Sequence, residues 1–425
     1  MKSTSDRLHP LLVRAVAQGL QSIFRDNRHA DKVIENTLRQ NTKAGSRDRA
    51  FIAETTYEIV RYYRLYTEIL GITPHNEADF WLLVGVHFLV KENPVPLPNW
   101  IEFKSLNPPF ILKKATELRN IRKFRESIPD WLDELGAAEL GDRWDETLAW
   151  LNKPAQVVLR ANRLRTDRMA LRQALRTEGI ETEPYGEDSD ALVLQRRQNV
   201  FQTKAFQDGW FEVQDYSSQQ VAPLLMPWPG QRVVDACAGG GGKSLHLAAL
   251  MQNRGTLIAL DTLNWKLEEL RTRARRAGVA NIETRVIENN KVIKRLYDSA
   301  DRLLLDVPCS GLGVIRRNPD SKWKMTLDSI EKLKKTQQEI LQSYSPILKA
   351  GGRMVYATCS ILPSENEQQV AAFLASEAGR DFSLVKDLKI LPQDEGFDGF
   401  YMAVLQKKRG EIAAEEGENP IFAIG

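Results

Sequence analysis

Residues 233–250 read VVDACAGGGGKSLHLAAL, and they form the clearest structural signal in this chain. An apolar strand ends at Asp235, four glycines follow at 239–242, and a helical pattern begins near Lys243. Glycines let the backbone approach a ligand closely, and the first N–H groups of a helix are free to donate hydrogen bonds. In an α/β sheet, such a strand, loop and helix predict a ligand site at the carboxyl end of the strand.

The chain beyond residue 230 alternates apolar stretches with helical segments. Near-continuous runs of Val, Ile and Leu are typical of strands that are covered on both faces. The alternation therefore predicts an α/β domain with a doubly wound parallel sheet. The expected strands are RVVDAC (232–237), TLIALD (256–261), IETRVI (282–287), RLLLDV (302–307), RMVYAT (353–358) and a last one within DGFYMAVLQKK (398–408).

The first 225 residues have a different texture. Residues 1–150 show helical spacing with almost no strand alternation, which predicts a helical domain. Residues 151–225 predict a small α+β module with a strand, a helix and two further strands. The expected division is thus 1–150, 151–225 and 226–410, followed by an acidic tail at 411–425.

The composition is that of an ordinary globular protein. Its 425 residues are 42% hydrophobic and 27% charged, which excludes a disordered, collagen-like or coiled-coil chain. The net charge is only +3, so any nucleic-acid site must come from local clusters of basic residues. Three cysteines cannot form a disulfide framework, and they indicate a reducing compartment. The near-apolar run at 80–90 falls short of the ~20 residues that span a bilayer, and no signal peptide precedes it, so we expect a cytoplasmic protein.

The glycine loop does not match a nucleotide-triphosphate site. A P-loop needs G-x-x-x-x-G-K-[ST], and counting back from Lys243 puts Cys237 where the first glycine must stand. A P-loop nucleotidase is therefore the disfavoured alternative. The next strand ends in Asp261, and an acid at that position commonly binds ribose hydroxyls, although it can also cap the following helix. A nucleoside that carries no phosphates fits this pattern, and S-adenosylmethionine has that character.

The cysteines supply the strongest clue to the chemistry. Cys237, Cys309 and Cys359 each follow a predicted strand, so all three belong to the edge of the sheet where α/β ligands bind. No C-x-x-C or pair of histidines accompanies them, so we expect no metal site. His246 is the only histidine after residue 87, which disfavours a Cys–His hydrolase. For Cys237, simple packing is an alternative role.

Three segments together resemble the Sun/RsmB (NOL/NOP/Sun) group of ribosomal RNA cytosine-C5 methyltransferases. They are DACAGGGGKS (235–244), LDVPCSGLGVIRRNPDSKW (305–323) and ATCSILPSENE (357–367). WFEVQDYSSQ (210–219) and GFDGFYMAVL (396–405) also look like this family, so the resemblance covers nearly the whole chain. It implies a helical domain like that of the antitermination factor NusB, a small ferredoxin-like or RNA-recognition-like module, and a Rossmann-like domain that uses S-adenosylmethionine.

The resemblance also implies roles for individual residues. Cys359 is the nucleophile in the family pattern, Cys309 assists product release, and Asp306 lies between the cofactor and the base. Asp261 and the glycine loop hold S-adenosylmethionine, the loop residues being Cys237, Ala238, Gly239, Gly240, Gly241, Gly242 and Lys243. This chain departs from the pattern at Gly239 and Gly240, where the family usually has Ala-Pro or Ala-Gly. It also has Asn289 where the family usually has an acid near the adenine.

Basic residues flank the Cys309 motif and predict an RNA surface. Arg316, Arg317, Lys322 and Lys324 are interleaved with Trp323, a combination that suits phosphate contacts and base stacking. The expected partner is RNA, most simply ribosomal RNA, with transfer RNA as the other acceptor. We expect a monomer that contacts no membrane. The competing hypothesis is a catalytically silent RNA-binding or ribosome-assembly protein with the same fold.

Overall fold

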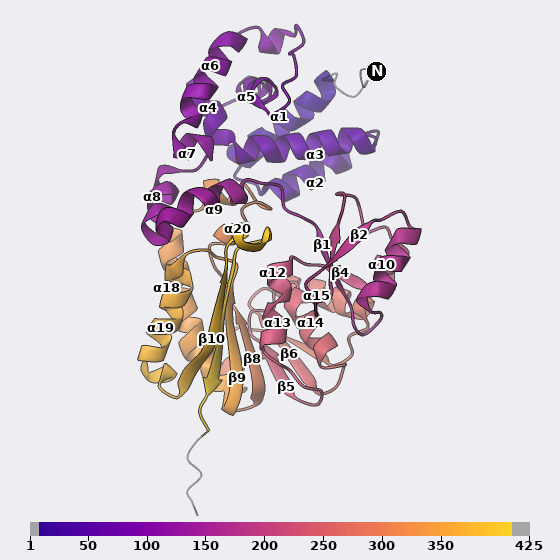
Figure 1. The fold of residues 1–425 in the computed structure, drawn as a ribbon, viewed down its shortest axis with the longest axis vertical. Helices are drawn as coiled ribbons and strands as arrows, with labels where there is room; N and C mark the ends of the chain where they lie inside the picture. Colours follow the sequence, from indigo (N-terminus) through magenta and orange to yellow (C-terminus); the bar gives the residue numbers. More distant parts are fainter. Residues whose placement is uncertain (1–7, 410–425) are drawn as a thin grey trace, which may run out of the picture.

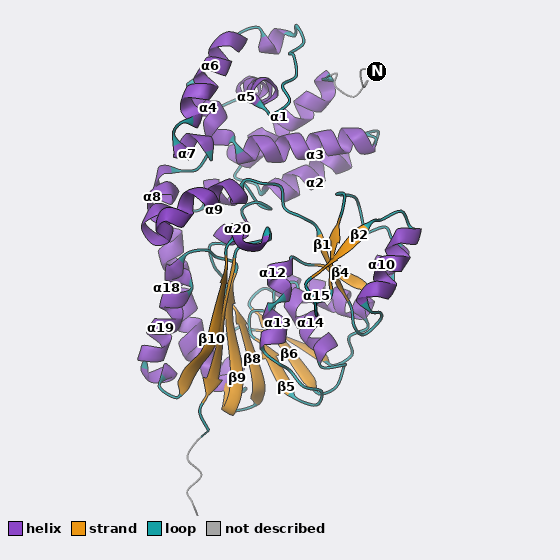
Figure 2. Ribbon diagram, in the orientation of Figure 1, coloured by secondary structure: helices purple, strands orange, loops and turns teal. Residues whose placement is uncertain are grey.

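The computed structural model describes residues 8–409 of the chain (Figure 1). A helical part, a small four-stranded sheet and a large seven-stranded sheet follow one another along the sequence (Figure 2). The predicted acidic tail at 411–425 lies outside the described residues. Within residues 8–409, each helix is too short or too polar to cross a lipid bilayer.

The helical domain is built around α5 (Glu77–Val90). This helix contains the near-apolar run 80–90, and ten of its residues are buried because other helices surround it. Asn76 caps its first turn by accepting a hydrogen bond from Asp79 N at 3.1 Å. The other helices of this domain are α1 (Pro10–Phe24), α2 (Ala30–Gln40), α3 (Ser46–Arg61), α4 (Tyr63–Leu70), α6 (Pro108–Arg119) and α7 (Arg122–Arg125). This arrangement is compatible with the expected NusB-like domain.

Two further helices lie between the helical domain and the large sheet. α8 (Asp130–Leu140) and α9 (Trp144–Leu151) share a core with the domain of the large sheet, not with α1–α6. Trp144 is fully buried there, and a Cβ at Gly136 would meet its ring at 2.3 Å. The apolar faces of α8 and α9 pack against the segments that follow Cys309 and Cys359, so this shared core begins near residue 128, whereas the boundary at residue 150 stays an expectation.

The small module has the β-α-β-β-α-β order of ferredoxin-like folds. Its strands are all antiparallel and lie in the order β2-β3-β1-β4. The elements are β1 (Val158–Ala161), α10 (Arg168–Thr177), β2 (Thr182–Tyr185), β3 (Ala191–Leu194), α11 (Lys204–Gln207) and β4 (Phe211–Val213). β2 was not predicted, because it is a partly exposed edge strand that contains Pro184.

The large sheet has the order β10-β11-β9-β8-β5-β6-β7. Its strands are β5 (Arg232–Asp235), β6 (Thr256–Asp261), β7 (Ile282–Val286), β8 (Ala300–Asp306), β9 (Leu348–Thr358), β10 (Phe382–Ile390) and β11 (Phe400–Lys407). The sheet is mixed, which corrects the expected all-parallel arrangement, because β11 runs antiparallel to both β9 and β10. β10 was not predicted, since most of its residues are exposed at the edge.

Alternate residues of the buried strands face opposite layers of helices. Leu303, Leu305 and Tyr356 pack toward α16 (Asn290–Lys294), α18 (Leu327–Tyr344) and α19 (Glu367–Ala375). Leu304 and Val355 pack toward α13 (Val221–Leu224) and α14 (Gly242–Leu250). β5 and β8 are neighbours, and the chain continues outward from them in opposite directions. Their carboxyl ends thus form the topological switch point at which α/β sheets bind ligands.

Candidate active site

The glycine loop joins β5 to α14 and requires glycine at two positions. Gly239 and Gly241 have φ angles of 55° and 87°, in the left-handed region. A Cβ at Gly241 would meet Leu270 at 2.1 Å, whereas one at Gly239 would meet nothing within 4 Å, because Gly239 faces a cavity. Asp261 fixes the loop: its Oδ2 accepts a hydrogen bond from Gly239 N at 2.9 Å, and its Oδ1 accepts one from Leu263 N at 2.9 Å.

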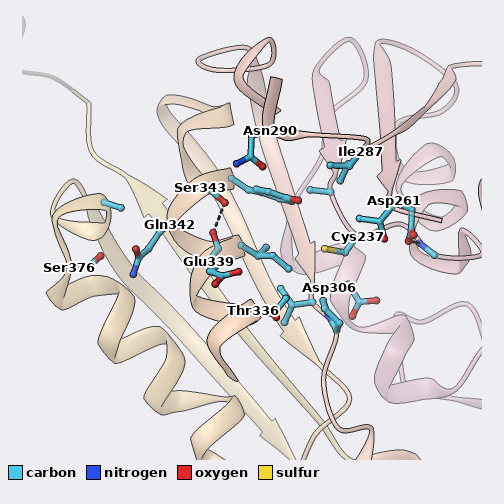
Figure 3. A pocket seen from close by; sticks show the side chains of 18 of the residues that line it. Cys237, Asp261, Ile287, Asn290, Asp306, Thr336, Glu339, Gln342, Ser343 and Ser376 are labelled. Carbon is cyan, nitrogen blue, oxygen red and sulfur yellow. Dashed lines mark hydrogen bonds between the residues drawn. The ribbon is translucent and has the colours of Figure 1, made fainter. Parts of the chain in front are cut away.

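A cavity of about 1070 Å³ opens at this edge of the sheet (Figure 3). Cys237, Gly239, Asp261 and Asp306, four of the residues expected to bind the cofactor, line it. The other loop residues do not line it; they are Ala238, Gly240, Gly241, Gly242 and Lys243. The opposite wall comes from α18 and was not predicted; it includes Thr336, Glu339, Gln342, Ser343 and Tyr344. An amphipathic helix gives no sequence signal for which side chains face a ligand.

Asn289 does not line the cavity. Its Oδ1 accepts a hydrogen bond from Lys291 N at 2.9 Å and so caps α16. The cavity wall at this point comes from Asn290 and Ile287 instead (Figure 3). Asn289 therefore caps a helix at the position where an adenine contact was expected, because Asn at the position before a helix preferentially caps it.

Lys243 and Asp306 form an ion pair at the switch point. Lys243 Nζ lies 2.7 Å from Asp306 Oδ2, and it is also 5.1 Å from the centre of the Phe400 ring. Burial lowers the pKa of Lys243, but the charge of Asp306 and its hydrogen bond outweigh that effect, so the pKa is raised overall. Lys243 is thus engaged with Asp306 in this structure.

The two cysteines of the family motifs lie side by side. Because β8 and β9 are neighbouring parallel strands with Asp306 opposite Ala357, their following loops bring Cys309 Sγ and Cys359 Sγ to 3.4 Å. The hydrogen bond with Cys359, together with burial, raises the pKa of the Cys309 thiol well above its ordinary value. Cys237 lines the cavity, and burial raises the pKa of its thiol as well.

The basic residues after Cys309 do not form the expected RNA surface. Arg316 is only 4% exposed, and its guanidinium donates to the carbonyls of Gly396, Phe397 and Pro154 at 2.8–3.0 Å. Lys322 is 2% exposed, with Nζ 3.5 Å from the carbonyl oxygen of Glu126. The prediction of phosphate contacts is wrong for these two residues, because their charges are enclosed by protein.

The other two basic residues are also engaged within the chain. Arg317 pairs with Asp215 at 2.7 Å and with Asp398 at 2.5 Å, and both carboxylates are buried. Lys324 donates to Asp320 at 2.8 Å and to the carbonyl of Arg28 at 2.7 Å. The four residues therefore attach the segment after Cys309 to the helical domain and to the small module, which corrects their predicted role.

Comparisons with known proteins agree with this architecture. A family model described as 16S rRNA methyltransferase RsmB/F matches residues 222–406. A second, described as the ferredoxin-like domain of RsmF/B-like methyltransferases, matches residues 128–201. It begins close to the boundary that the core of α8 and α9 indicates.

Individual relatives extend the match. A probable ribosomal RNA small subunit methyltransferase B from Synechocystis sp. is 31% identical, over 91% of this chain and 97% of its own length. The ribosomal RNA small subunit methyltransferase B of Vibrio cholerae is 36% identical, over 67% of this chain and 66% of its own length. The crystal structure of a protein named PH0851 is 25% identical with a TM-score of 0.80, covering 94% of this chain and 99% of that one. The chain therefore belongs to the RsmB/F family of 16S rRNA methyltransferases.

Proposed function

We propose that this chain methylates carbon 5 of a cytosine in small-subunit ribosomal RNA, with Cys359 as the nucleophile. The observation that carries the proposal is the 3.4 Å separation of Cys309 Sγ and Cys359 Sγ, at the ligand-binding edge of a methyltransferase fold. Two thiols in contact suit a reaction in which one attaches to the substrate and the other helps to release it. The ribosomal acceptor is supported by the names of the relatives.

S-adenosylmethionine is the cofactor of this methyltransferase family, and when bound it supplies an electrophilic methyl group to carbon 5. The residues at the glycine loop fit it. Gly239 leaves the cavity open beside the loop, and Cys237 and Gly239 line it there. Each carboxylate oxygen of Asp261 accepts one hydrogen bond and keeps a lone pair that can accept a ribose hydroxyl. Ile287 and Asn290 offer an apolar and a polar contact to the adenine.

Carbon 5 of cytosine is too weak a nucleophile to take a methyl group unaided. The Cys359 thiolate adds to carbon 6, forming a sulfur–carbon bond and moving the electron pair of the C5–C6 double bond into the ring, where it makes carbon 5 nucleophilic. Because a free thiol is mostly protonated at neutral pH, Cys359 must first release its thiol proton to water.

Asp306 supports N3 of the base as negative charge develops there. In the resting structure Asp306 accepts a hydrogen bond from Lys243, so the pair holds a proton between two groups. In this proposal Lys243 supplies that proton, and Asp306 passes it on to N3 of the base. This role follows from the position of Asp306 on the cavity wall, between the glycine loop and the Cys309 loop.

Cys309 completes the cycle: it first releases its own thiol proton to water, and its thiolate then removes the proton from carbon 5. The electron pair of that carbon–hydrogen bond re-forms the C5–C6 double bond and expels Cys359 as a thiolate. In the resting enzyme the hydrogen bond with Cys359 is the largest cause that raises the pKa of Cys309. That cause disappears once Cys359 is bonded to carbon 6, so covalent attachment itself prepares Cys309 to act as a base.

A base paired inside a duplex cannot reach the two thiols. The target cytosine must therefore lie in a single-stranded segment or be flipped out of its stack. RNA fragments that hold the target in a loop should be better substrates than the same sequence in a duplex.

The two cysteines make the proposal testable. Cys359→Ala should abolish methylation of small-subunit ribosomal RNA while leaving S-adenosylmethionine binding intact. Cys309→Ala should methylate once and then stall, giving a covalent protein–RNA species that survives denaturing gel electrophoresis. The double variant should give no such species. An adduct that depends on Cys309 and persists in Cys359→Ala would reverse the assignment, and unchanged bisulfite sequencing of RNA from cells lacking the protein would reject the function.

A further inference from the structure

Each of the two cysteines is followed by a serine, and the serines meet as closely as the cysteines do. Ser310 Oγ lies 3.3 Å from Ser360 Oγ, beside the 3.4 Å contact of the two sulfurs. Both hydroxyls donate to the same oxygen of Glu365, Oε2, each at 2.5 Å. One carboxylate therefore joins two loops that come from different strands, 50 residues apart in sequence.

The other oxygen of Glu365 is bonded as well. Oε1 accepts from Ser310 N at 2.8 Å and from Gln337 Nε2 at 3.0 Å, and Gln337 Nε2 also lies 3.0 Å from the carbonyl oxygen of Pro308. The Glu365 side chain is fully buried, yet within residues 8–409 it has no Lys, Arg or His within ion-pair distance. Burying a charge without a counter-ion costs free energy, and the four hydrogen bonds that Glu365 accepts offset this cost. The role of the carboxylate is therefore to hold these four donors in place.

The residues around Glu365 hold the Cys359 loop from the other side. The Glu365 carbonyl accepts a hydrogen bond from Tyr356 OH at 2.7 Å. Asn366 accepts from Thr358 Oγ1 at 2.5 Å and donates through Nδ2 to the carbonyl of Ser360 at 3.0 Å. The residues immediately before and after Cys359 are thus bonded to the same two-residue segment, which leaves the loop little freedom to move alone.

We propose that Glu365 is a positioning residue that sets the distance between Cys309 and Cys359. The inference rests on the proposed function for its catalytic meaning, because the two thiols must serve adjacent atoms, carbons 6 and 5 of one ring. A shift of either loop by about 1 Å would leave one thiol out of reach, and misplacements of that size can cost about 100-fold in rate. Since Ser310 and Ser360 share one acceptor oxygen, neither loop can shift without breaking a bond to Glu365.

Glu365 also influences Cys309 through its charge. After the hydrogen bond with Cys359, burial and the Cys359 charge, the negative charge of Glu365 is a further cause that raises the pKa of Cys309. The same carboxylate therefore acts on the positions of both cysteines and on the pKa of Cys309.

The test measures thiol separation directly, independently of methylation. In the full-length protein, a short bifunctional thiol reagent should join Cys309 to Cys359, and peptide mass spectrometry should identify the linked pair. Glu365→Gln, which keeps the shape but loses the charge, should lower the yield of that link at least tenfold and slow single-turnover methylation by about 100-fold. The KM for RNA and the affinity for S-adenosylmethionine should not change.

Matched variants complete the design. Glu367→Gln removes a carboxylate two residues away, which pairs with Lys389 at 3.1 Å, and it should behave as wild type. Ser310→Ala and Ser360→Ala each remove one of the two hydroxyl groups that Glu365 holds, and each should reduce the yield of the Cys309–Cys359 link. These two variants test the proposal even if Glu365→Gln does not fold. A wild-type yield of the link in Glu365→Gln, Ser310→Ala and Ser360→Ala would overturn the proposal. If the wild-type protein forms the link but methylates no RNA, the proposed function is rejected, whereas the positioning role of Glu365 is not.

Discussion

Trp323 Nε1 donates a hydrogen bond to the backbone carbonyl of Val60 at 2.7 Å. The first residue belongs to the segment after Cys309, and the second lies in α3 of the helical domain. The same segment is anchored nearby, where Asp320 accepts a hydrogen bond from Ala30 N at 3.1 Å. The helical domain therefore holds the far end of the Cys309 loop.

The Trp323 anchor can be tested without removing the aromatic ring. Trp323→Phe should destabilise the protein by ~1–3 kcal/mol, because the Val60 carbonyl loses its donor while remaining buried. Hydrogen exchange of residues 309–326 should speed up more than exchange elsewhere. The control is Trp228→Phe, since Trp228 is 61% exposed. Equal effects of the two substitutions would show that the anchor contributes nothing.

Asp261 should govern cofactor affinity. Asp261→Ala removes the expected ribose contacts and also frees the Gly239 N–H that the carboxylate holds. We expect S-adenosylmethionine binding to weaken by ~1.5–3 kcal/mol, the range for hydrogen bonds to a charged group, as measured by calorimetry. Asp298→Ala, at an exposed position before β8, should bind normally. Tight binding of ATP with no binding of S-adenosylmethionine would contradict the assignment.

Lys243 should matter for chemistry more than for binding. Lys243→Met removes the proton that the pair with Asp306 shares, and general acid–base assistance is worth about 10²–10⁴-fold. We expect the single-turnover methylation rate to fall within that range while the Kd for RNA stays the same. Lys291→Met, at an exposed position on α16, is the matched control. A rate that is unchanged in Lys243→Met would mean that Asp306 acts without its partner.

Arg317 should contribute to stability in a pH-dependent way. Burial, followed by the charge of Asp215, raises the pKa of Asp398 from its ordinary 3.8 to about 6. The folded protein thus favours the protonated form of Asp398. The contribution of this group to folding stability is therefore present below about pH 4 and is lost as the pH rises through about 6. Arg317 limits this loss by pairing with the ionised form.

Removal of Arg317 should therefore destabilise the folded protein most at pH values above the pKa of Asp398. Urea unfolding of Arg317→Ala should show a loss of ~3–5 kcal/mol at pH 8, typical of a buried pair that loses one partner, and a smaller loss at pH 5. The control Arg143→Ala breaks an ion pair with Asp394 whose side chains are 50% and 36% exposed. It should cost no more than ~1 kcal/mol at either pH. A loss at pH 5 as large as that at pH 8 would contradict the role of Asp398.

The buried strands and the site at their ends could be predicted from sequence because both depend on local patterns. A run such as RLLLDV (302–307) fits only a strand covered on both faces, and the polar residue at its end must lie at the edge of the sheet. β10 lacks this signal, since Lys386 and Asp387 are exposed at the edge of the sheet. Its place is fixed by pairing with β11, which local sequence does not record.

The basic residues after Cys309 show why the rest of the site could not be predicted. A cluster such as Arg316, Arg317 and Lys322 reads the same whether it faces RNA or protein. What decides between them is the supply of acceptors from distant segments, such as Asp215 and Pro154. The hydrogen bonds from Ser310 and Ser360 to Glu365 were not predicted for the same reason, although the Cys-Ser pair that occurs in both motifs is a sequence signal for them.

The core that α8 and α9 share with the residues after Cys309 determines how the chain could be divided into pieces. A C-terminal fragment cut at residue 150 would lose Trp144 and Leu148 and leave Leu312 and Ile361 facing water. It would also lose Glu139, which accepts hydrogen bonds from Ser364 N at 2.9 Å and Ser364 Oγ at 2.7 Å, five residues after Cys359. Limited proteolysis should accordingly release a stable product that starts before residue 130, so the smallest autonomous unit of this protein carries its own piece of the helical region.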